Sequence, residues 1–449
     1  MATIKPFRGV RYNPDKISDL SAVVSQPHDR VQGLQDKYYD LSPYNVIRLI
    51  KGKEQPGDGK NDNVYTRARD AYQAWLREGI LIRDQVPALY VLRQTFSLPD
   101  GSVKVRQGLI AALELTHFDE GIVLPHERTL SDSMLDRLNL LRAVAMNFSS
   151  VFMLYPGSQI NGLLAPITER QPAREFHELL EHDVLQQFWA VTDSDVIATV
   201  AEEMAPKRNL IIADGHHRYE TSLKYRDEMR AKYPDAPPQA GFNYRSVMLV
   251  SMDDPGLVIL PTHRLIHSYT RMSGAEALEK AKKYFQVTRV AGRAELEATL
   301  RAAQASSQSC FGFHDGTSAV LTLRSTKAMD RLLPDRTPEW RKLDVAVAHE
   351  LFIEQVLGID KQAVADHQFV EFLRDAQVGY EAVSQGKAKF LLLMNPTRIE
   401  QVQTCSTAGE RMPQKSTDFY PKAISGLVAL PVGVEERLER RRNITQHGE

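Results

Sequence analysis

The chain of 449 residues has only two cysteines, Cys310 and Cys405, and no CxxC spacing. This scarcity argues against a disulfide framework and a structural zinc site, and it fits a reducing compartment. No apolar run reaches the roughly 20 residues of a membrane-spanning helix. The start, MATIKPFRGVRY, lacks the apolar segment of a signal peptide. These absences predict a cytoplasmic protein without a membrane partner.

The chain also has little net charge. It carries 56 basic and 57 acidic residues, for a formal net charge of -1. Without a global positive field, a nucleic-acid partner is not expected, although a local basic pocket remains compatible with this balance. No GxGxxG follows an expected strand and no GxxxxGK[ST] occurs, so neither a Rossmann dinucleotide site nor a Walker loop is supported.

Periodicity predicts a mixture of helices and hairpins. Residues 64–79 have helical spacing, and residues 88–115 read as two strands joined by a Pro-Asp-Gly turn. The segments 245–252 and 257–263 read as paired strands. Because no βαβ unit repeats, we expect an α+β (mixed α/β) fold.

A change of pattern near residue 268 predicts two portions and a tail. Residues 1–267 form the expected N-terminal α/β catalytic portion, and residues 268–432 form a C-terminal α/β portion that contributes a basic loop. Residues 433–449 are highly charged and are expected to be a solvated tail.

The densest chemistry follows the apolar segment NLIIAD, which ends at Asp214 and precedes a helical pattern. The N-terminus of a helix has unpaired N–H groups and partial positive charge, and it binds anions, phosphate above all. Gly215 permits a tight turn, and His216, His217 and Arg218 add donors. Asp214 is suited to hold Mg²⁺ or to accept a hydroxyl proton. We therefore predict a phosphate-binding corner with Asp214 and His216 in catalytic roles.

Two other interpretations of this corner remain open. Asp214 is also a suitable helix cap, with surface histidines after it. Alternatively, His216 or His217 ligates a metal together with Asp214. Adjacent helical residues point about 100° apart, which disfavours two neighbouring histidines on one metal.

A second polar group, Pro125-His126-Glu127-Arg128-Thr129, lies on an expected loop. A loop glutamate between a histidine and an arginine can act as a general base when its surroundings tune its pKa. We predict Glu127 as a catalytic base and His126, Arg128 and Thr129 as substrate-binding residues. The alternative is a surface salt-bridge cluster.

A third group lies near the C-terminus, where Lys415, Ser416, Thr417 and Lys422 place two lysines and two hydroxyls in one loop. Together with Asn395 at a strand end, this loop is suited to grip a polyanion. A merely polar loop is the alternative.

Two weaker signals remain, of which only the first supplies expected site residues. His263 and Arg264 end an expected strand, where they either line a substrate pocket or face water. The segment Pro27-His28-Asp29-Arg30-Val31 resembles the Glu127 group but is shorter.

Several of these segments together carry a family likeness. They are FRGVRY, SPYNVIRLI, PHERT, ADGHHRYET, PTHRL, LDVAVAHELFIEQVLGI, LLLMNPT and KSTDFYPKAISGLV. In this order, from about residue 6 to residue 430, they resemble the bacterial and archaeal DUF1015 proteins. One departure is Pro27-His28-Asp29, where the family more often has Pro-Tyr-Asp.

The resemblance implies a function. The Asp-Gly-His-His-Arg turn is similar to the phosphate-binding turn of the ParB/sulfiredoxin-type fold, a group that includes kinases of free L-serine. It implies that Asp214 supports catalysis and that a glutamate, by analogy Glu127, activates the serine hydroxyl. Gly215, His217, Arg218, Lys415, Ser416, Thr417 and Lys422 would then bind phosphate. Pyrophosphate, ADP or ATP is the implied donor, with Mg²⁺ as cofactor.

Three functions are compared on this basis. The favoured one is a small-molecule phosphotransferase, most simply a free serine kinase that makes O-phosphoserine, since phosphoryl transfer needs cations, a metal and a hydroxyl-orienting acid. The second is a metal-dependent phosphatase or other hydrolase that activates water. The third is a ParB-like nucleotide-binding regulatory module.

Overall fold

The computed structural model describes residues 1–31, 33–127, 131–180, 184–306 and 308–438. Contacts between Cα atoms divide the chain into two compact units. Unit 1 comprises Met1–Pro125, Thr129–Leu257 and Pro421–Glu449, and unit 2 comprises His126–Arg128 and Val258–Tyr420. By this division the boundary between the units falls between Leu257 and Val258, whereas the sequence pattern places it near residue 268. The segment from Pro421 onward belongs to unit 1 again. Most of the expected tail, residues 439–449, lies outside the described residues.

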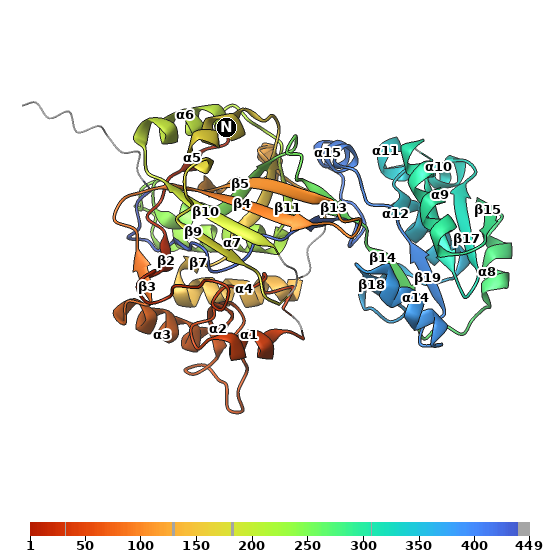
Figure 1. Cartoon of the computed structure of the whole chain (residues 1–449), viewed down its shortest axis with the longest axis horizontal. Coiled ribbons are helices and arrows are strands. Elements are labelled where there is room, and N and C mark those ends of the chain that lie inside the picture. The colour runs from red at the N-terminus through yellow and green to blue at the C-terminus, as the bar shows by residue number, and fades with distance from the viewer. Residues whose placement is uncertain (32, 128–130, 181–183, 307, 439–449) are drawn as a thin grey trace, which may run out of the picture. The chain divides into compact units, whose positions relative to one another are not determined.

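Unit 1 is built on a nine-stranded mixed sheet (Figure 1). Its strands are β1 (Ile4–Lys5), β4 (Leu89–Ser97), β5 (Val103–Glu114), β6 (Val123–Pro125), β8 (Val151–Tyr155), β9 (Arg174–His177), β10 (Leu185–Val191), β11 (Leu210–Asp214) and β12 (Tyr244–Ser251). Their order is β6-β11-β8-β12-β5-β4-β10-β9, with β1 on β5. The pairs β11/β6 and β12/β8 are parallel, and the other pairs are antiparallel. The short pairs β2 (Val10–Tyr12)/β3 (Leu81–Arg83) and β7 (Met146–Asn147)/β21 (Leu430–Pro431) belong to the same unit.

Helices cover this sheet. They are α1 (Gln35–Leu41), α2 (Ile47–Ile50), α3 (Val64–Arg77), α4 (Ser131–Val144), α5 (Gln159–Thr168), α6 (Ser194–Met204) and α7 (His216–Lys232), with short 3₁₀ turns at Phe118–Glu120 and Gly241–Asn243. Apolar side chains of α5, α6 and α7 share one core with the strands. Helix α4 packs on α7, and α3 packs on α4. Helix α7 therefore lies between the sheet and a second helical layer.

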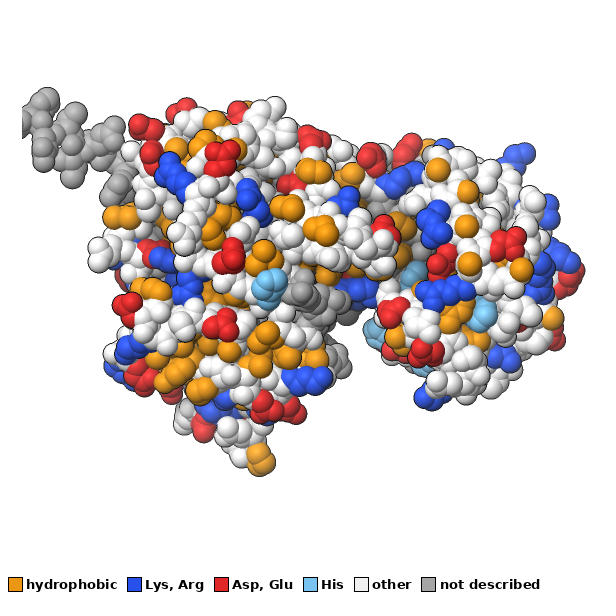
Figure 2. Space-filling view, in the orientation of Figure 1, with side chains coloured by type: hydrophobic (Ala, Val, Ile, Leu, Met, Phe, Trp, Pro, Cys, Tyr) orange, Lys and Arg blue, Asp and Glu red, His pale blue; other side chains and the backbone are white. Residues whose placement is uncertain are grey.

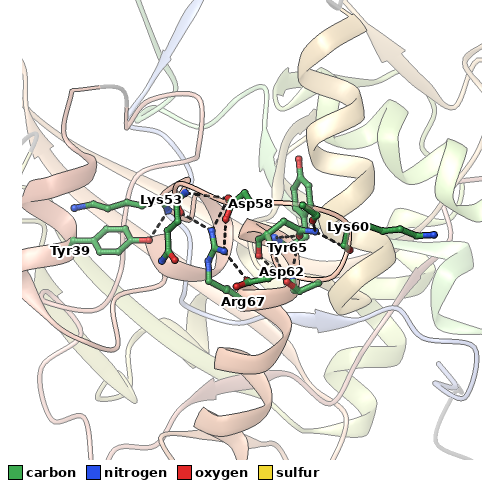
Figure 3. A network of polar contacts seen from close by, with 11 residues as sticks. Tyr39, Lys53, Asp58, Lys60, Asp62, Tyr65 and Arg67 are labelled. Carbon is green, nitrogen blue, oxygen red and sulfur yellow. Dashed lines mark hydrogen bonds and ion pairs between the residues drawn. The ribbon is translucent and has the colours of Figure 1, made fainter.

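A polar loop, residues 53–63, is held by one arginine of α3, as Figure 3 shows. The Arg67 guanidinium donates to Asp58 at 2.7 and 2.9 Å, to Asp62 at 2.9 Å and to the Lys53 carbonyl at 3.1 Å. The loop lies on the protein surface, where polar residues are favoured. Contacts of these side chains, rather than a hydrophobic core, hold its backbone.

The Arg67→Ala variant is expected to loosen this loop without unfolding the protein. The contacts are solvent-exposed, and such contacts add little to global stability. Hydrogen exchange of residues 53–62 should accelerate, while the urea midpoint should stay close to that of the wild type. Arg69→Ala, an arginine two residues along α3, is the matched control. Equal exchange in both variants would contradict the prediction.

Unit 2 contains a six-stranded antiparallel sheet, in the order β15-β17-β16-β19-β14-β18. These strands are β14 (His263–Ile266), β15 (Phe285–Val290), β16 (Cys310–His314), β17 (Ser318–Leu323), β18 (Val370–Leu373) and β19 (Phe390–Leu393). The pair β13 (Val258–Leu260)/β20 (Asp418–Tyr420) accompanies it. Its helices are α8 (Gly274–Ala281), α9 (Arg293–Ala305), α10 (Lys327–Leu332), α11 (Pro338–Arg341), α12 (Asp344–Val347), the π-helix η3 (Ala348–Val356), α13 (Lys361–Ala365), α14 (Ala376–Ser384) and α15 (Ile399–Thr407).

The predicted mixed α/β class is confirmed by these two sheets and their helices. The hairpin expected over 88–115 is present as β4 and β5. The expected pairing of 245–252 with 257–263 is wrong: β12 pairs with β5 and β8, and β13 pairs with β20. Neighbouring apolar runs look like a hairpin in sequence, but both sides of β12 are already taken by other strands.

Two further properties concern membranes and charge. No helix within the described ranges is both long and apolar enough to cross a membrane. Figure 2 shows Lys and Arg side chains interspersed with Asp and Glu over the visible face of each unit, as the net charge of -1 leads one to expect.

Candidate functional site

The corner predicted at Asp214 is formed by the end of β11 and the start of α7. The first four residues of β11 are buried, because this strand lies between β6 and β8 in the sheet. The register against β8 shifts between Ile212 and Asp214. Such an irregularity re-aims the following side chains, and here the chain turns directly into the first residue of α7, His216.

Gly215 is required at this turn for two reasons. Its φ is +97°, in the left-handed region that favours glycine. A Cβ on Gly215 would also lie 2.9 Å from three atoms of the Arg218 guanidinium group. Arg218 therefore folds back over the glycine, and only glycine leaves room for that arrangement.

Asp214 forms the centre of a buried charge cluster. One carboxylate oxygen pairs with Arg218, and the other lies 3.1 Å from Nζ of Lys422. The side chains of Arg218 and Lys422 are 5% and 4% exposed, so Asp214 supplies a buried counter-charge to both cations. Burial would raise the pKa of Asp214, but Lys422, Arg218 and Arg30 hold it well below its usual range.

The segment around His28 joins the same cluster, although its sequence signal was weak. Burial, Arg137 and Arg218 lower the pKa of His28 to about 3, so the imidazole is neutral. Partial burial and the charge of Asp214 raise the pKa of Asp29, but His28, Arg218 and Arg30 lower it more. Asp29 and Arg30 are thus functional candidates that the sequence reasoning did not select. The recurrence of a His-acid-Arg pattern was the signal for them.

The structure bears on the capping interpretation of Asp214. The residue in the N-cap position of α7 is Gly215, not Asp214, and no side chain caps the helix from that position. The carboxylate of Asp214 instead binds the two cations. His216 is buried and His217 is partly buried in the first turn. Their predicted roles in catalysis and phosphate binding stay predictions.

The structure also bears on metal binding. Within the described ranges, no group of three or more His, Cys, Asp or Glu side chains is arranged to hold a metal ion. Mg²⁺ usually binds proteins through only one or two carboxylates and keeps waters or phosphate oxygens as its other ligands. Asp214 and Asp29 are two carboxylates whose charges interact, and the predicted role of Asp214 in holding Mg²⁺ stays a prediction.

The predicted base, Glu127, belongs to unit 2. Its Oε1 is buried and has no hydrogen-bond partner within the described ranges, and its side chain is 23% exposed. His126 is fully buried, with Nε2 2.7 Å from Oγ1 of Thr417. His126 thereby fixes the loop that carries Thr417. Arg128 and Thr129, predicted to bind substrate, lie outside the described residues.

The predicted basic loop is divided between the two units. Lys415, Ser416 and Thr417 belong to unit 2, whereas Lys422 belongs to unit 1. Lys415 has a φ of +54°, uncommon for a residue with a side chain, and it is exposed. The buried Ser416 donates to the Pro413 carbonyl at 2.6 Å. The left-handed backbone at Lys415 is therefore held by its neighbours, as at many ligand-binding loops.

Arg264 stabilises the loop at Lys415 from the interior of unit 2. It is fully buried, and it donates to the Lys415 carbonyl at 3.0 Å and to Nε2 of His349 at 3.0 Å. Burial lowers the pKa of Arg264 to about 9, while the charge of Glu127 opposes this shift. His263 accepts a bond of 3.1 Å from the Met394 N–H, and burial lowers its pKa to about 4. Both residues are engaged inside unit 2, and their substrate contacts stay predictions.

A cavity of about 260 Å³ lies within unit 2 beside η3. It is lined by Arg336, Trp340, His349, Glu350, Ile353, Glu354, Ile359, Lys361, Val364, Ala365, Arg411, Met412, Pro413 and Gln414. The motif LDVAVAHELFIEQVLGI contributes His349, Glu350 and Glu354 to its wall. Through Gln414 the cavity adjoins Lys415, so unit 2 has room for a small ligand beside that loop.

Asn395, another predicted binding residue, donates to the Leu300 carbonyl at 3.2 Å and to the carboxylate of Asp344. The Cys310 N–H also donates to Asp344, at 3.2 Å. Burial nevertheless raises the pKa of Asp344 to about 7. This carboxyl group is therefore an ionisable group of the unit 2 interior, with Asn395 as its hydrogen-bond partner.

The Asp344→Asn variant is expected to stabilise the protein at pH 8 but hardly at pH 4. Between about pH 4 and pH 7 only the folded state keeps the Asp344 proton, so wild-type stability falls as the pH rises. A pKa raised by about three units corresponds to about 4 kcal/mol above pH 7. Urea unfolding at both pH values measures the gain, with Asp366→Asn, at an exposed position, as the control. A gain independent of pH would contradict the assignment.

The sequence match agrees with the likeness that the motifs suggest. Residues 4–346 match DUF1015, a family described as proteins of unknown function. The chain therefore belongs to the DUF1015 family. A comparison with curated proteins found no match.

Several solved structures resemble the chain distantly. A free serine kinase in complex with AMP matches with 11% identity and a TM-score of 0.36, over 73% of this chain and 92% of the kinase. A variant of a free serine kinase in complex with ADP matches with 11% identity and a TM-score of 0.37, over 74% of this chain and 94% of the kinase. A conserved hypothetical protein from Pyrococcus furiosus matches with 10% identity and a TM-score of 0.33, over 73% of this chain and 96% of that protein. At these values the likenesses carry no argument about the activity of this chain.

Proposed function

We propose that the protein is a small-molecule phosphotransferase, a free L-serine kinase that forms O-phosphoserine from serine and pyrophosphate, ADP or ATP. The observation that supports this proposal is the charge cluster at the start of α7, where Arg218 and Lys422 hold the carboxylate of Asp214. Phosphoryl transfer depends on positioning and charge stabilisation, for which buried cations at a helix N-terminus are suited.

In the proposed reaction the serine Oγ attacks the transferred phosphorus atom. The Oγ–P bond forms, the bond from phosphorus to the leaving phosphate or nucleotide oxygen breaks, and the hydroxyl proton passes to the carboxylate of Glu127. Arg218 and Lys422 neutralise the phosphate oxygens once these displace the carboxylate of Asp214. Asp214 and Asp29 would hold Mg²⁺, which supplies further neutralising charge when bound.

The remaining predicted residues have supporting roles in this proposal. Gly215, His217, Lys415, Ser416 and Thr417 would contact phosphate, and His216 would act beside Asp214. The proposed serine contacts are His126, Arg128, Thr129, His263, Arg264 and Asn395.

Phosphorus NMR of the purified protein with Mg²⁺, L-serine and each donor in turn tests the proposal. A phosphoserine signal with one donor supports the kinase and identifies that donor. Orthophosphate alone would instead indicate the hydrolase. Unchanged spectra with all three donors would remove serine as the acceptor. DNA retention on nitrocellulose at moderate salt would favour the regulatory module.

A further inference from the structure

Arg245 is a buried cation without a carboxylate partner among the described side chains. It lies on β12, whose eight residues are all buried, and is 4% exposed. Its guanidinium donates to the Ser149 carbonyl at 2.5 Å, but its Nε has no hydrogen-bond partner within the described ranges. No carboxylate pairs with Arg245 in that same part of the chain. Burial and the charge of Arg218 lower the pKa of Arg245 well below its usual range.

Arg245 lines a small cavity of unit 1 together with other cations. The cavity has a volume of about 40 Å³, and its wall includes Arg137, Arg218, Arg245 and His28. Arg137 and Arg218 are 8% and 5% exposed. Nε2 of His28 is also buried and lacks a hydrogen-bond partner among the described residues. The side chains that carry these two nitrogens therefore line one cavity together with Arg137 and Arg218, beside apolar residues such as Leu140 and Phe148.

Burying charges of one sign together is unfavourable unless an opposite charge joins them. Asp214 compensates Arg218, Asp136 pairs with Arg137 at 2.5 Å, and Asp29 lies beside His28, which leaves Arg245 without a paired carboxylate among the described side chains. A bound anion would supply the missing charge. The forked guanidinium group suits oxyanions in particular, because it donates two parallel hydrogen bonds.

We infer that this arginine pocket, formed by Arg137, Arg218, Arg245 and His28, binds one phosphate-sized tetrahedral oxyanion. Its volume admits a single small group and excludes a nucleoside. Because Arg218 also pairs with Asp214, the bound anion lies beside the corner. The inference thus extends the proposed function, but the pocket binds its anion whether or not a phosphoryl group is transferred.

Thermal unfolding in orthophosphate, compared with sodium chloride of equal ionic strength, tests the pocket. Wild-type Tm should rise with phosphate beyond the chloride effect, because a ligand that binds only the folded state stabilises it. Arg245→Met should weaken the apparent Kd for phosphate at least about tenfold, since it removes charge-assisted hydrogen bonds. Arg142→Met, the same change at an exposed arginine of α4, should respond like the wild type.

Arg245→Met removes an unpaired charge, so its Tm without phosphate should not fall below that of the wild type. If this variant does not fold, Arg245→Lys keeps the charge but not the fork, and it should still weaken phosphate binding. The inference is overturned if wild-type Tm does not respond specifically to phosphate, or if both variants at Arg245 respond fully. It is also overturned if acetate or L-serine, but not phosphate, gives the Arg245-dependent shift.

These results separate the pocket from the kinase. An Arg245-dependent phosphate shift without transfer in the NMR experiment would refute only the proposed kinase. Transfer to serine with phosphate binding independent of Arg245 would refute only the pocket.

Discussion

The Asp214→Asn variant should lose phosphoryl transfer by about 10²- to 10⁴-fold per folded molecule, the range typical of a lost acid–base group. Asparagine keeps the shape of the side chain but cannot carry the negative charge that orders Arg218 and Lys422. Both cations would then lack their carboxylate, and any metal ion would lose a ligand. The rate of O-phosphoserine formation, normalised to the folded fraction, measures the effect. Asp227→Asn, at an exposed position of α7, is the control.

The same substitution should also destabilise the protein, by about 3 kcal/mol at neutral pH, because it removes a buried carboxylate that pairs with both Arg218 and Lys422. The pKa of Asp214 is lowered in the folded state, so its contribution is present above about pH 4 and is lost as the pH falls. The difference between wild type and variant in urea unfolding should therefore shrink below pH 4. Full activity per folded molecule would mean that Asp214 is purely structural.

The corner was predictable because its signals are local. A short apolar strand, a glycine and a helical pattern follow one another directly, and the structure has β11, Gly215 and α7 in that order. The mixed α/β class followed from the same kind of local periodicity. The role of Gly215 in accommodating Arg218 adds a packing reason that the sequence order alone does not contain.

The partners of the corner were less predictable because they come from distant segments. Lys422 was selected as part of a loop with Lys415, yet it pairs with the carboxylate of Asp214 in unit 1. Asp29 reaches the cluster through tertiary folding, which no local pattern encodes. Arg245 had one signal in the sequence: an arginine at the start of an otherwise uncharged, largely apolar strand must either be exposed or find a buried partner.

The mistaken pairing of 245–252 with 257–263 has a related cause. Sequence proximity favours a hairpin, but strands in a large sheet compete for partners along the whole chain. Residues 245–251 of this segment lie in β12, between β5 and β8. The strands on its two edges, β5 and β8, therefore take the pairing positions that the next apolar segment in the sequence would need.

The Glu127→Gln variant is expected to slow serine phosphorylation strongly while leaving the protein folded. A general base needs a carboxylate oxygen free to take a proton, and Oε1 of Glu127 has no hydrogen-bond partner within the described ranges. Glutamine has nearly the same shape but cannot accept that proton, so we expect a loss of about 10²- to 10⁴-fold. Donor consumption and phosphoserine formation, both followed by phosphorus NMR, should fall together.

Glu371→Gln, at an exposed position of β18, is the matched control and should keep wild-type activity. A competing role for Glu127 is to compensate the charge of Arg264, whose pKa of about 9 depends partly on it. In that case Glu127→Gln would mainly lower the free energy of unfolding and leave the activity of the folded fraction intact. Donor consumption that persists without phosphoserine would have a third meaning: water replaces serine as the acceptor, and Glu127 selects the hydroxyl rather than drives the transfer.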